Sequence, residues 1–437
     1  EYGGGAWWAD RGVVWCVSWQ DQRLYRRDPH TGQMIALTPE PATPRGDRYA
    51  DGSVSPNGLT IACVREHHPP DGQGAADVRN EIVRLVANEP SEPEVVVSGP
   101  DFVAAPRFSP SGRKLCWIEW EHPNMPWDGT RLLVRDLVTG DTVRLAGSDQ
   151  ESVTQPTWLS EDEIAFISDH RGWWNLYRIA AGGGQPEPLV EIDADIGEPH
   201  WVFGGSRYAI LAGGRIAFAR WRDGFDGLAI REGDGRLADL ELPFTAVRTV
   251  RAAGNDSVVT VAATPVTEKS VSRIRLDRAG GASTPETLRA PRDLGDLGID
   301  TSYRSRPEAI GFPSAPGRRA HALFYPPTNP DCTAPDGELP PLLVEIHGGP
   351  TSSASPELDL SLQYWTSRGF AVVDVNYGGS TGFGRAYRDL LHGTWGIVDV
   401  EDCIAAARWL AGTAGPAWAG GQARVDGARR RCSPPRR

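Results

Sequence analysis

The sequence predicts an all-β propeller followed by the N-terminal part of a doubly wound α/β domain, and three observations support this fold class. Up to about residue 300, short runs rich in Val, Ile, Trp and Tyr alternate with Asp, Asn, Gly and Pro turns, as strands do. These runs repeat with a period of roughly 40 to 50 residues. Beyond residue 341, continuous apolar strands alternate with helical patterns, which indicates an incomplete doubly wound sheet with parallel pairing.

The repeats combine an aromatic or apolar residue, a polar turn and an alternating strand. Six copies align on turn residues that are 48, 54, 49, 44 and 50 positions apart: Asp10, Gly58, Gly112, Glu161, Gly205 and Asn255. Units of this length are typical of propeller blades, so we expect about six blades. A pair of β-sandwiches is the alternative all-β arrangement. Most of the 16 Trp lie in the repeats, where we expect them to pack between blades.

The change of pattern near residue 300 defines four expected parts of the chain. Residues 1–300 form the propeller, whose N-terminus we expect to be incomplete because the chain begins with Glu1 rather than Met. Residues 301–341 are a Pro-rich linker and the start of the second domain. Residues 342–412 form the partial α/β domain, with strands at 342–346 and 370–377 and a helix at 399–411. Residues 413–437 form an aberrant tail that we expect to be disordered.

The composition disfavours several classes of protein. With 45 Lys+Arg against 57 Asp+Glu and a formal charge of −12, the chain has no basic stripe for nucleic acid or an anionic membrane. The cysteines lack the spacing of a zinc site or a disulfide scaffold, and we expect no metal and no cofactor. Apolar runs of about five to eight residues are too short to span a bilayer, and the N-terminus shows no signal pattern, so we expect a cytoplasmic protein.

The strand at 342–346 ends directly in His347, Gly348, Gly349 and Pro350. In α/β-hydrolases a loop of this type supplies one backbone N–H of the oxyanion hole. Glycine suits that role because no side chain obstructs the approach of the amide to the developing negative charge. The alternative is a plain turn after a strand. The loop is therefore a candidate oxyanion-hole element.

Residues 378–382 (Gly-Gly-Ser-Thr-Gly) match the G-x-S-x-G pattern of a nucleophile elbow, but their position argues against that role. The segment follows only the second strand of the domain, one strand too early. Only 57 residues follow Ser380, and Asp389 precedes His392, whereas a hydrolase triad runs Ser, acid, His. We therefore expect a Gly-rich loop that leads into a helix.

A further polar cluster lies at the expected rim of the propeller. Glu66, His67 and His68 stand at the end of a strand in the second recognisable blade. Such a cluster could face a substrate, although charges at a rim are usually only solvated. The other histidines of the repeats are expected to be structural: His122, His170 and His200.

Long segments of the chain resemble the prolyl oligopeptidase family of serine peptidases, specifically its acylaminoacyl-peptidase and dipeptidyl aminopeptidase-like bacterial branch. The resemblance covers nearly the whole chain, and the motifs occur in a common order. The propeller signatures are EYGGGAWW (1–8), HPNMPWDGTRL (122–132), SDHRGWWNLYR (168–178) and WVFGGSRYA (201–209). Three later segments resemble the start of the family's catalytic domain: EIHGGPTS (345–352), VDVNYGGSTGFGRAYR (373–388) and WGIVDVEDC (395–403).

The resemblance implies a propeller that caps an α/β-hydrolase domain and admits only small peptides, which are cleaved through an acyl-enzyme. It also implies that Gly349 offers its backbone N–H to the tetrahedral intermediate and that His347 and Gly348 belong to the active-site loop. Three further residues would lie near the mouth of the active site, without an assigned catalytic step: Asn376, Tyr377 and Arg385.

The end of the chain departs from the family pattern. After the helix at 399–411 the family has a strand and an elbow close to G-G-S-A-G-G, whereas residues 413–437 contain no apolar run that could form that strand. We identify no nucleophile, acid or catalytic histidine and expect the chain as given to be inactive. A reading-frame change near Ala428, a truncation and a natural remnant are the explanations left open. The alternative function is a peptide-binding or protein-binding propeller with a vestigial hydrolase segment.

Overall fold

The computed structural model describes residues 3–70, 72, 74–277, 281–295, 298–335 and 338–412. The chain divides into two compact units. Unit 1 comprises residues 1–192 and 199–206, and unit 2 comprises residues 193–198 and 207–437. The tail predicted at 413–437 lies outside the described residues.

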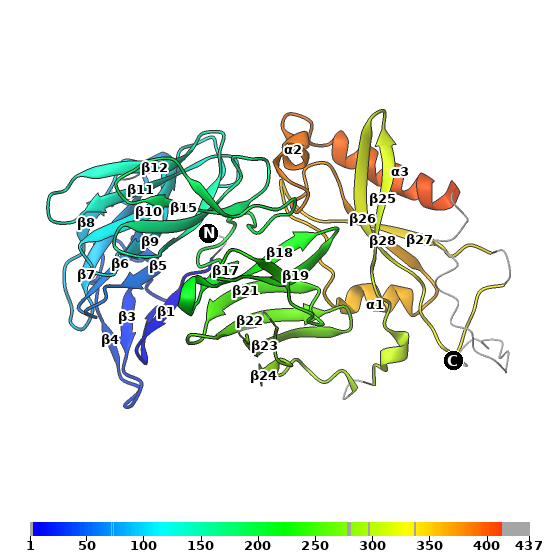
Figure 1. Cartoon of the computed structure of the whole chain (residues 1–437), viewed down its shortest axis with the longest axis horizontal. Helices are drawn as coiled ribbons and strands as arrows, with labels where there is room; N and C mark the ends of the chain where they lie inside the picture. The colour runs from blue at the N-terminus through cyan, green and yellow to red at the C-terminus, as the bar shows by residue number, and fades with distance from the viewer. Residues whose placement is uncertain are drawn as a thin grey trace. The chain divides into compact units, whose positions relative to one another are not determined.

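The described part of unit 1 contains four sheets, each made of four consecutive antiparallel strands (Figure 1). Each strand pairs with the next one in sequence, which is the meander of a propeller blade. The first two sheets comprise β1 (Trp7–Asp10), β2 (Val13–Val17), β3 (Leu24–Arg27), β4 (Met34–Ala36), β5 (Asp47–Val54), β6 (Thr60–His67), β7 (Arg79–Val86) and β8 (Glu94–Val97), with η1 (Ala75–Asp77) before β7. The other two comprise β9 (Phe102–Phe108), β10 (Lys114–Trp120), β11 (Thr130–Asp136), β12 (Thr142–Ser148), β13 (Val153–Trp158), β14 (Glu163–Ser168), β15 (Asn175–Ala180) and β16 (Glu187–Val190).

The tryptophans of unit 1 differ in their burial. Trp117 and Trp174 are buried in the core, and the ring of Trp127 lies 4.2 Å from that of Trp201. Trp19, by contrast, is 81% exposed, so the expected packing of tryptophans in the repeats does not extend to every one.

Unit 2 begins with two further meanders of the same kind. They comprise β17 (Tyr208–Ile210), β18 (Ile216–Arg222), β19 (Phe225–Arg231), β20 (Leu237–Asp239), β21 (Ala246–Ala252), β22 (Ser257–Thr264), β23 (Thr267–Arg275) and β24 (Glu286–Arg289), with η2 (Ala212–Gly214) between β17 and β18. The described residues before 300 thus form six four-stranded sheets.

Five of the six aligned turn residues lie at the turn between the first and second strands of a sheet. The alignment is wrong for Gly205, which precedes β17, because the turn in that sheet is formed by η2. β17, the first strand of that sheet, has only three residues. Because this strand is so short, the Gly-Gly turn before it resembles in sequence the hairpin turn that follows the first strand of the other repeats.

The last sheet has the order β25-β26-β28-β27 and mixes both pairing directions (Figure 1). Its strands are β25 (Glu308–Ala315), β26 (Arg318–Tyr325), β27 (Leu342–Ile346) and β28 (Ala371–Asn376). β27 and β28 are parallel, as predicted, whereas β26 is antiparallel to β28. The helical segments are η4 (Thr301–Tyr303), α1 (Leu360–Thr366), α2 (Arg385–Arg388), η5 (Asp389–Leu391) and α3 (Val398–Gly412).

Helices cover the two faces of this sheet. Val373 and Val375 of β28 pack with Ala406 and Leu410 of α3. Val372, which points to the opposite face, packs with Leu362 of α1. This arrangement of six meanders and a partial two-sided sheet confirms the predicted fold class.

The described residues lack two features. None of their helices is long and apolar enough to cross a bilayer. No three of their His, Cys, Asp and Glu side chains are grouped so that they could hold a metal ion. Cys16, Cys63, Cys116 and Cys403 are free thiols, whereas Cys332 is disulfide-bonded.

A buried ion pair connects the two meanders of unit 2. Arg207 Nη2 lies 2.6 Å from Asp226 Oδ1, and both side chains are only 4% exposed. Asp226 Oδ2 accepts the N–H of Val247 on β21 at 2.8 Å, and Arg207 Nε donates to Ile196 O at 3.0 Å. These hydrogen bonds compensate the desolvation of both charges, so removal of one partner leaves the other charge buried and unpaired.

We predict that Asp226→Ala lowers the free energy of unfolding by about 3–5 kcal/mol, because Arg207 loses its buried counter-charge. The measurement is urea unfolding followed by tryptophan fluorescence. Exposed Asp234 provides the matched control, and Asp234→Ala should change the free energy by less than about 0.5 kcal/mol. Equal effects of the two variants would contradict a structural role for the pair.

Candidate oxyanion site

The candidate site lies at the carboxyl ends of β27 and β28. The two strands pair in parallel from Leu342 with Ala371 to Ile346 with Val375, so their following loops leave the sheet at the same edge. The first loop begins with His347, and the second begins with Tyr377. Parallel pairing therefore brings together two segments that are about thirty residues apart in sequence.

His347 links these two loops. Its Nε2 lies 2.6 Å from Ser380 Oγ, and its Nδ1 lies 2.8 Å from the carbonyl oxygen of Gly348. A carbonyl oxygen can only accept a hydrogen bond, so Nδ1 carries the proton. Nε2 then accepts a hydrogen bond from the Ser380 hydroxyl. The imidazole is stacked on the ring of Tyr377, with the two ring centroids 4.3 Å apart. Burial lowers the pKa of His347, which favours the neutral ring that this arrangement requires.

Gly349, the expected oxyanion donor, lies in the loop after β27. The residue is exposed, and no acceptor for its N–H occurs among the described residues. A Cβ at this position would lie 3.0 Å from the hydroxyl oxygen of Tyr377, which leaves little room for a side chain. At Gly348 a Cβ would meet no atom within 4 Å. Close approach of backbone and Tyr377 therefore occurs at Gly349 and not at Gly348.

Ser380 is fully buried, so its hydroxyl is not accessible to a substrate. A serine hydrogen-bonded to a histidine is also the arrangement of a nucleophile and its base. Because Ser380 is buried, this hydrogen bond instead fixes the ring of His347. Thr351 Oγ1 donates to Gly379 O at 2.7 Å, and the N–H of Thr381 donates to Ser352 O at 2.8 Å. These contacts hold the loop after β27 against the loop after β28.

Two buried carboxylates that the sequence analysis did not single out hold the second loop. Asp402 of α3 accepts the N–H of Gly378 at 2.8 Å and forms an ion pair with Arg318 at 2.9 Å. Asp195 accepts the N–H groups of Gly382 and Gly384 at 3.1 and 3.2 Å. The VEDC segment quoted for the family resemblance contains Asp402, but nothing local in the sequence marks Asp195.

Asn376 is the last residue of β28, and Tyr377 begins the second loop. Asn376 Oδ1 accepts the N–H of Ala354 at 2.8 Å. Tyr377 is 2% exposed, and its hydroxyl contacts His347 O at 3.3 Å. Burial raises the pKa of Tyr377 to about 12, with Asp399 and Cys403 adding to the shift, so this hydroxyl stays protonated.

Three carboxylates form an acidic group on the face of the sheet that packs against α1. Glu345 and Asp374 are directly paired neighbours on β27 and β28, and Asp359 caps the N-terminus of α1. Burial, together with the nearby Glu345 and Asp359, raises the pKa of Asp374 to about 7. The pKa of Glu345 is also raised by burial and by Asp359. Folding therefore disfavours the ionised forms of Asp374 and Glu345 relative to the unfolded chain.

The other sequence candidates do not join the site. His392 is 61% exposed, with Nδ1 4.0 Å from Asp389 Oδ1. Arg385 Nε lies 3.4 Å from Asp389 Oδ2 within one helical turn. In unit 1, His67 Nδ1 lies 2.6 Å from Asp47 Oδ1, and His68 Nε2 lies 2.7 Å from Glu66 Oε1. Each histidine of that cluster is thus paired with an adjacent carboxylate.

Comparison with known proteins agrees with this fold. Residues 356–414 match the model of the prolyl oligopeptidase family. The chain is similar to a puromycin-hydrolyzing peptidase of Mycobacterium tuberculosis, with a TM-score of 0.85 and 40% identity over 94% of this chain and 64% of that one. Puromycin hydrolase gives a TM-score of 0.84 and 37% identity over the same shares. Probable dipeptidyl-peptidase 5 of Aspergillus terreus (strain NIH 2624 / FGSC A1156) is 24% identical over 386 residues, which are 85% of this chain and 44% of that protein.

The meanders and the partial two-sided sheet define a propeller joined to an α/β-hydrolase domain. Residues 356–414 are part of a prolyl oligopeptidase family domain, and that family consists of serine peptidases. The chain spans less than two thirds of the length of the relatives named above.

We predict that Ser380→Ala destabilises the protein by about 1–3 kcal/mol, because Nε2 of a buried imidazole loses its donor. Amide hydrogen exchange should accelerate at residues 347–349 in the same variant. Ser353 lies in the loop after β27, and its hydroxyl has no hydrogen-bond partner among the described residues. Ser353→Ala is therefore the matched control. An unchanged exchange rate in Ser380→Ala would show that the Ser380 contact does not order the loop.

We predict that Asp374→Asn stabilises the protein at pH 8 by about 1–3 kcal/mol but has little effect near pH 4. The folded-state pKa of Asp374 is above its ordinary value of 3.8. The favourable contribution of Asp374 to the free energy of unfolding therefore exists at low pH and disappears as the pH rises through about 7. Asparagine resembles the protonated carboxyl and removes this loss. Urea unfolding at both pH values, with Asp234→Asn as the exposed control, checks the sign. A gain at pH 4 equal to that at pH 8 would contradict it.

Proposed function

We propose that this chain provides the propeller and one oxyanion-hole donor of a serine peptidase that cleaves small peptides through an acyl-enzyme. The observation that carries the proposal is the exposed N–H of Gly349 at the carboxyl end of β27, on a loop fixed by buried contacts. Such a donor stabilises the oxyanion of a tetrahedral intermediate without reorganisation, because its orientation is set before substrate binds.

The proposed division of the chain follows its sequence pattern. The propeller comprises residues 1–300, the linker and first strands comprise residues 301–341, and the partial hydrolase domain comprises residues 342–412. In this proposal His347 and Tyr377 position Gly349, and neither exchanges a proton with substrate. Residues 1–437 alone provide no nucleophile, acid and base that we can identify, so we propose that they do not hydrolyse peptides by themselves.

Puromycin hydrolysis by two relatives suggests the class of substrate. Puromycin contains an aminoacyl group joined through an amide, so aminoacyl amides and short peptides are the substrates we propose for the complete active site. The propeller would limit access to substrates of this size.

The experiment joins residues 1–412 to the part of the Mycobacterium tuberculosis puromycin-hydrolyzing peptidase that this chain does not span. We expect the chimera to hydrolyse puromycin, whereas the 437-residue chain should show no rate above background. Gly349→Pro removes the N–H and should lower kcat of the chimera by about 10²–10³-fold, the effect of losing one oxyanion donor. Gly348→Ala, at a position with open space, is the matched control.

Three outcomes distinguish the parts of the proposal. Full activity of the Gly349→Pro chimera would contradict the role of Gly349. Hydrolysis by the 437-residue chain would contradict its proposed inactivity. Tight peptide binding by residues 1–300 alone, together with a folded but inactive chimera, would favour the binding-module function instead.

A further inference from the structure

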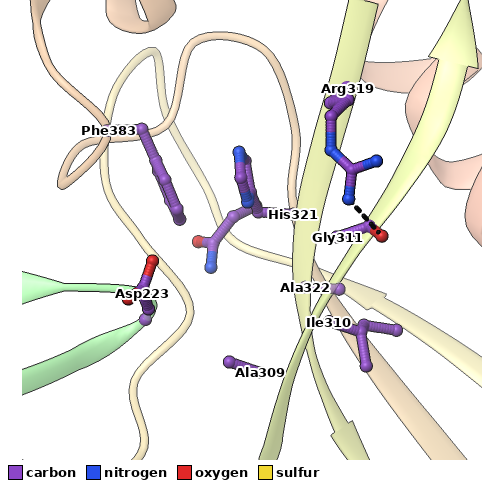
Figure 2. Close-up of a pocket in the computed structure, with 10 residues that line it drawn as sticks. Asp223, Ala309, Ile310, Gly311, Arg319, His321, Ala322 and Phe383 are labelled. Atoms are coloured by element: carbon purple, nitrogen blue, oxygen red, sulfur yellow. Dashed lines mark hydrogen bonds between the residues drawn. The ribbon is translucent and has the colours of Figure 1, made fainter. Parts of the chain in front are cut away.

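A cavity of about 250 Å³ lies beside the candidate site, at the carboxyl end of β28. Its walls come from β25, β26, β28, the turn between β18 and β19, and the loop after β28 (Figure 2). The exposed residues Asp223, Ala309 and Arg319 form its mouth, and buried Asn376 and Ala322 form its floor. In open α/β sheets, ligands bind outside the carboxyl ends of strands.

The floor of the cavity presents an unused hydrogen-bond donor. Asn376 is 1% exposed, and its Oδ1 accepts the N–H of Ala354 at 2.8 Å, which fixes the orientation of the amide. Its Nδ2 is buried and has no acceptor among the described residues. A buried donor without a partner costs about 1–3 kcal/mol, so this amide is suited to receive an acceptor from a ligand.

Two opposite charges stand at the mouth. Arg319 precedes His321 by two residues on β26 and therefore shares its face, and His321 is the direct cross-strand partner of Asn376. Arg319 Nη2 donates to Gly311 O at 2.8 Å, which holds the guanidinium over the sheet. Figure 2 shows Asp223 and Arg319 on opposite sides of His321.

The turn between β18 and β19 fixes the position of Asp223. Asp223 and Gly224 have φ values of 52° and 85°, as the two central residues of a type I′ hairpin turn do. A Cβ at Gly224 would lie 3.0 Å from Leu323 Cδ2, so the turn packs closely on β26. Asp223 is close enough to His321 to raise its pKa, although burial and Arg319 lower that pKa overall.

An aromatic wall closes the remaining side. The ring of Phe383 is stacked on that of His321 at 4.2 Å with an interplanar angle of 17°. The N–H groups on both sides of Phe383, those of Gly382 and Gly384, are bonded to Asp195. Gly382 also has no room for a side chain, because a Cβ there would lie 2.0 Å from Trp221 Nε1. The backbone that carries Phe383 is therefore firmly held.

We propose that this cavity binds a small zwitterion, a free α-amino acid with an apolar side chain. Its carboxylate accepts hydrogen bonds from Arg319 and Asn376 Nδ2, its ammonium group faces Asp223, and its side chain packs on Phe383. A simple anion would be repelled by Asp223, and a simple cation would be repelled by Arg319. The volume is below the about 300–1,000 Å³ of sites for drug-sized ligands, which fits a ligand of amino-acid size.

The inference goes beyond the proposed peptidase activity and does not depend on it, because binding is measured without turnover. It does connect the two sites structurally. Asn376 contacts the segment after β27 through Ala354 and immediately precedes Tyr377, which is stacked on His347. Occupation of the cavity would therefore bear directly on the loops that hold Gly349.

The experiment titrates the 437-residue chain with L-leucine by calorimetry and compares two analogues that each lack one charge. N-acetyl-L-leucine has no ammonium group, and L-leucinamide has no carboxylate. We expect L-leucine to bind and each analogue to bind at least about tenfold more weakly, since hydrogen bonds to charged groups contribute more than neutral ones.

Variants of the chain test the same contacts from the protein side. Arg319→Ala and Asp223→Asn should each weaken L-leucine binding at least about tenfold, and asparagine preserves the left-handed turn conformation. Arg289→Ala, on exposed β24, is the control and should bind as the parent does. Thermal unfolding must show that the variants remain folded. Absence of L-leucine binding by the parent, equal binding of the analogues, or unchanged binding by both folded variants would overturn the proposal.

Discussion

The parallel pairing of β27 with β28 is the constraint on which the rest of the site depends. Parallel strands end at the same edge of a sheet, so the loop that begins at His347 and the loop that begins at Tyr377 must leave the sheet together. Both loops are rich in glycine, which allows backbone amides to approach other groups closely but leaves the chain with much conformational freedom. A functional N–H in such a loop requires other residues to hold the backbone.

Buried polar side chains provide that restraint. Ser380 fixes the ring of His347, Asp402 holds the N–H of Gly378, and Asp195 holds the backbone around Phe383. Each contact joins segments that are distant in sequence, and the side chains of Ser380, Asp402 and Asp195 are buried. In the proposed function, their effect is to order Gly349 in advance, so that the cost of fixing the loop is met in folding and not during a reaction. The same contacts shape the cavity beside the site.

Much of the fold could be predicted because its signals are local. The apolar run at 342–346 coincides with β27, and the helix expected at 399–411 is α3 (Val398–Gly412). The contacts of the site could not be predicted in the same way. A hydrogen bond from Ser380 to His347 depends on strand order, and the partner loop of Asp195 is 187 residues away. The position of Ser380 in the chain argues against a nucleophile, but its contact with His347 has no signature in the sequence.

The measurement that tests this account most directly is a long-range ¹H–¹⁵N NMR spectrum of the histidine side chains at pH 7. The account predicts that His347 is a neutral imidazole with its proton on Nδ1 and a hydrogen-bonded, unprotonated Nε2. A proton on Nε2, or an imidazolium ring, would contradict it, because Ser380 could then no longer donate to His347 and the loop that carries Gly349 would lack its principal restraint.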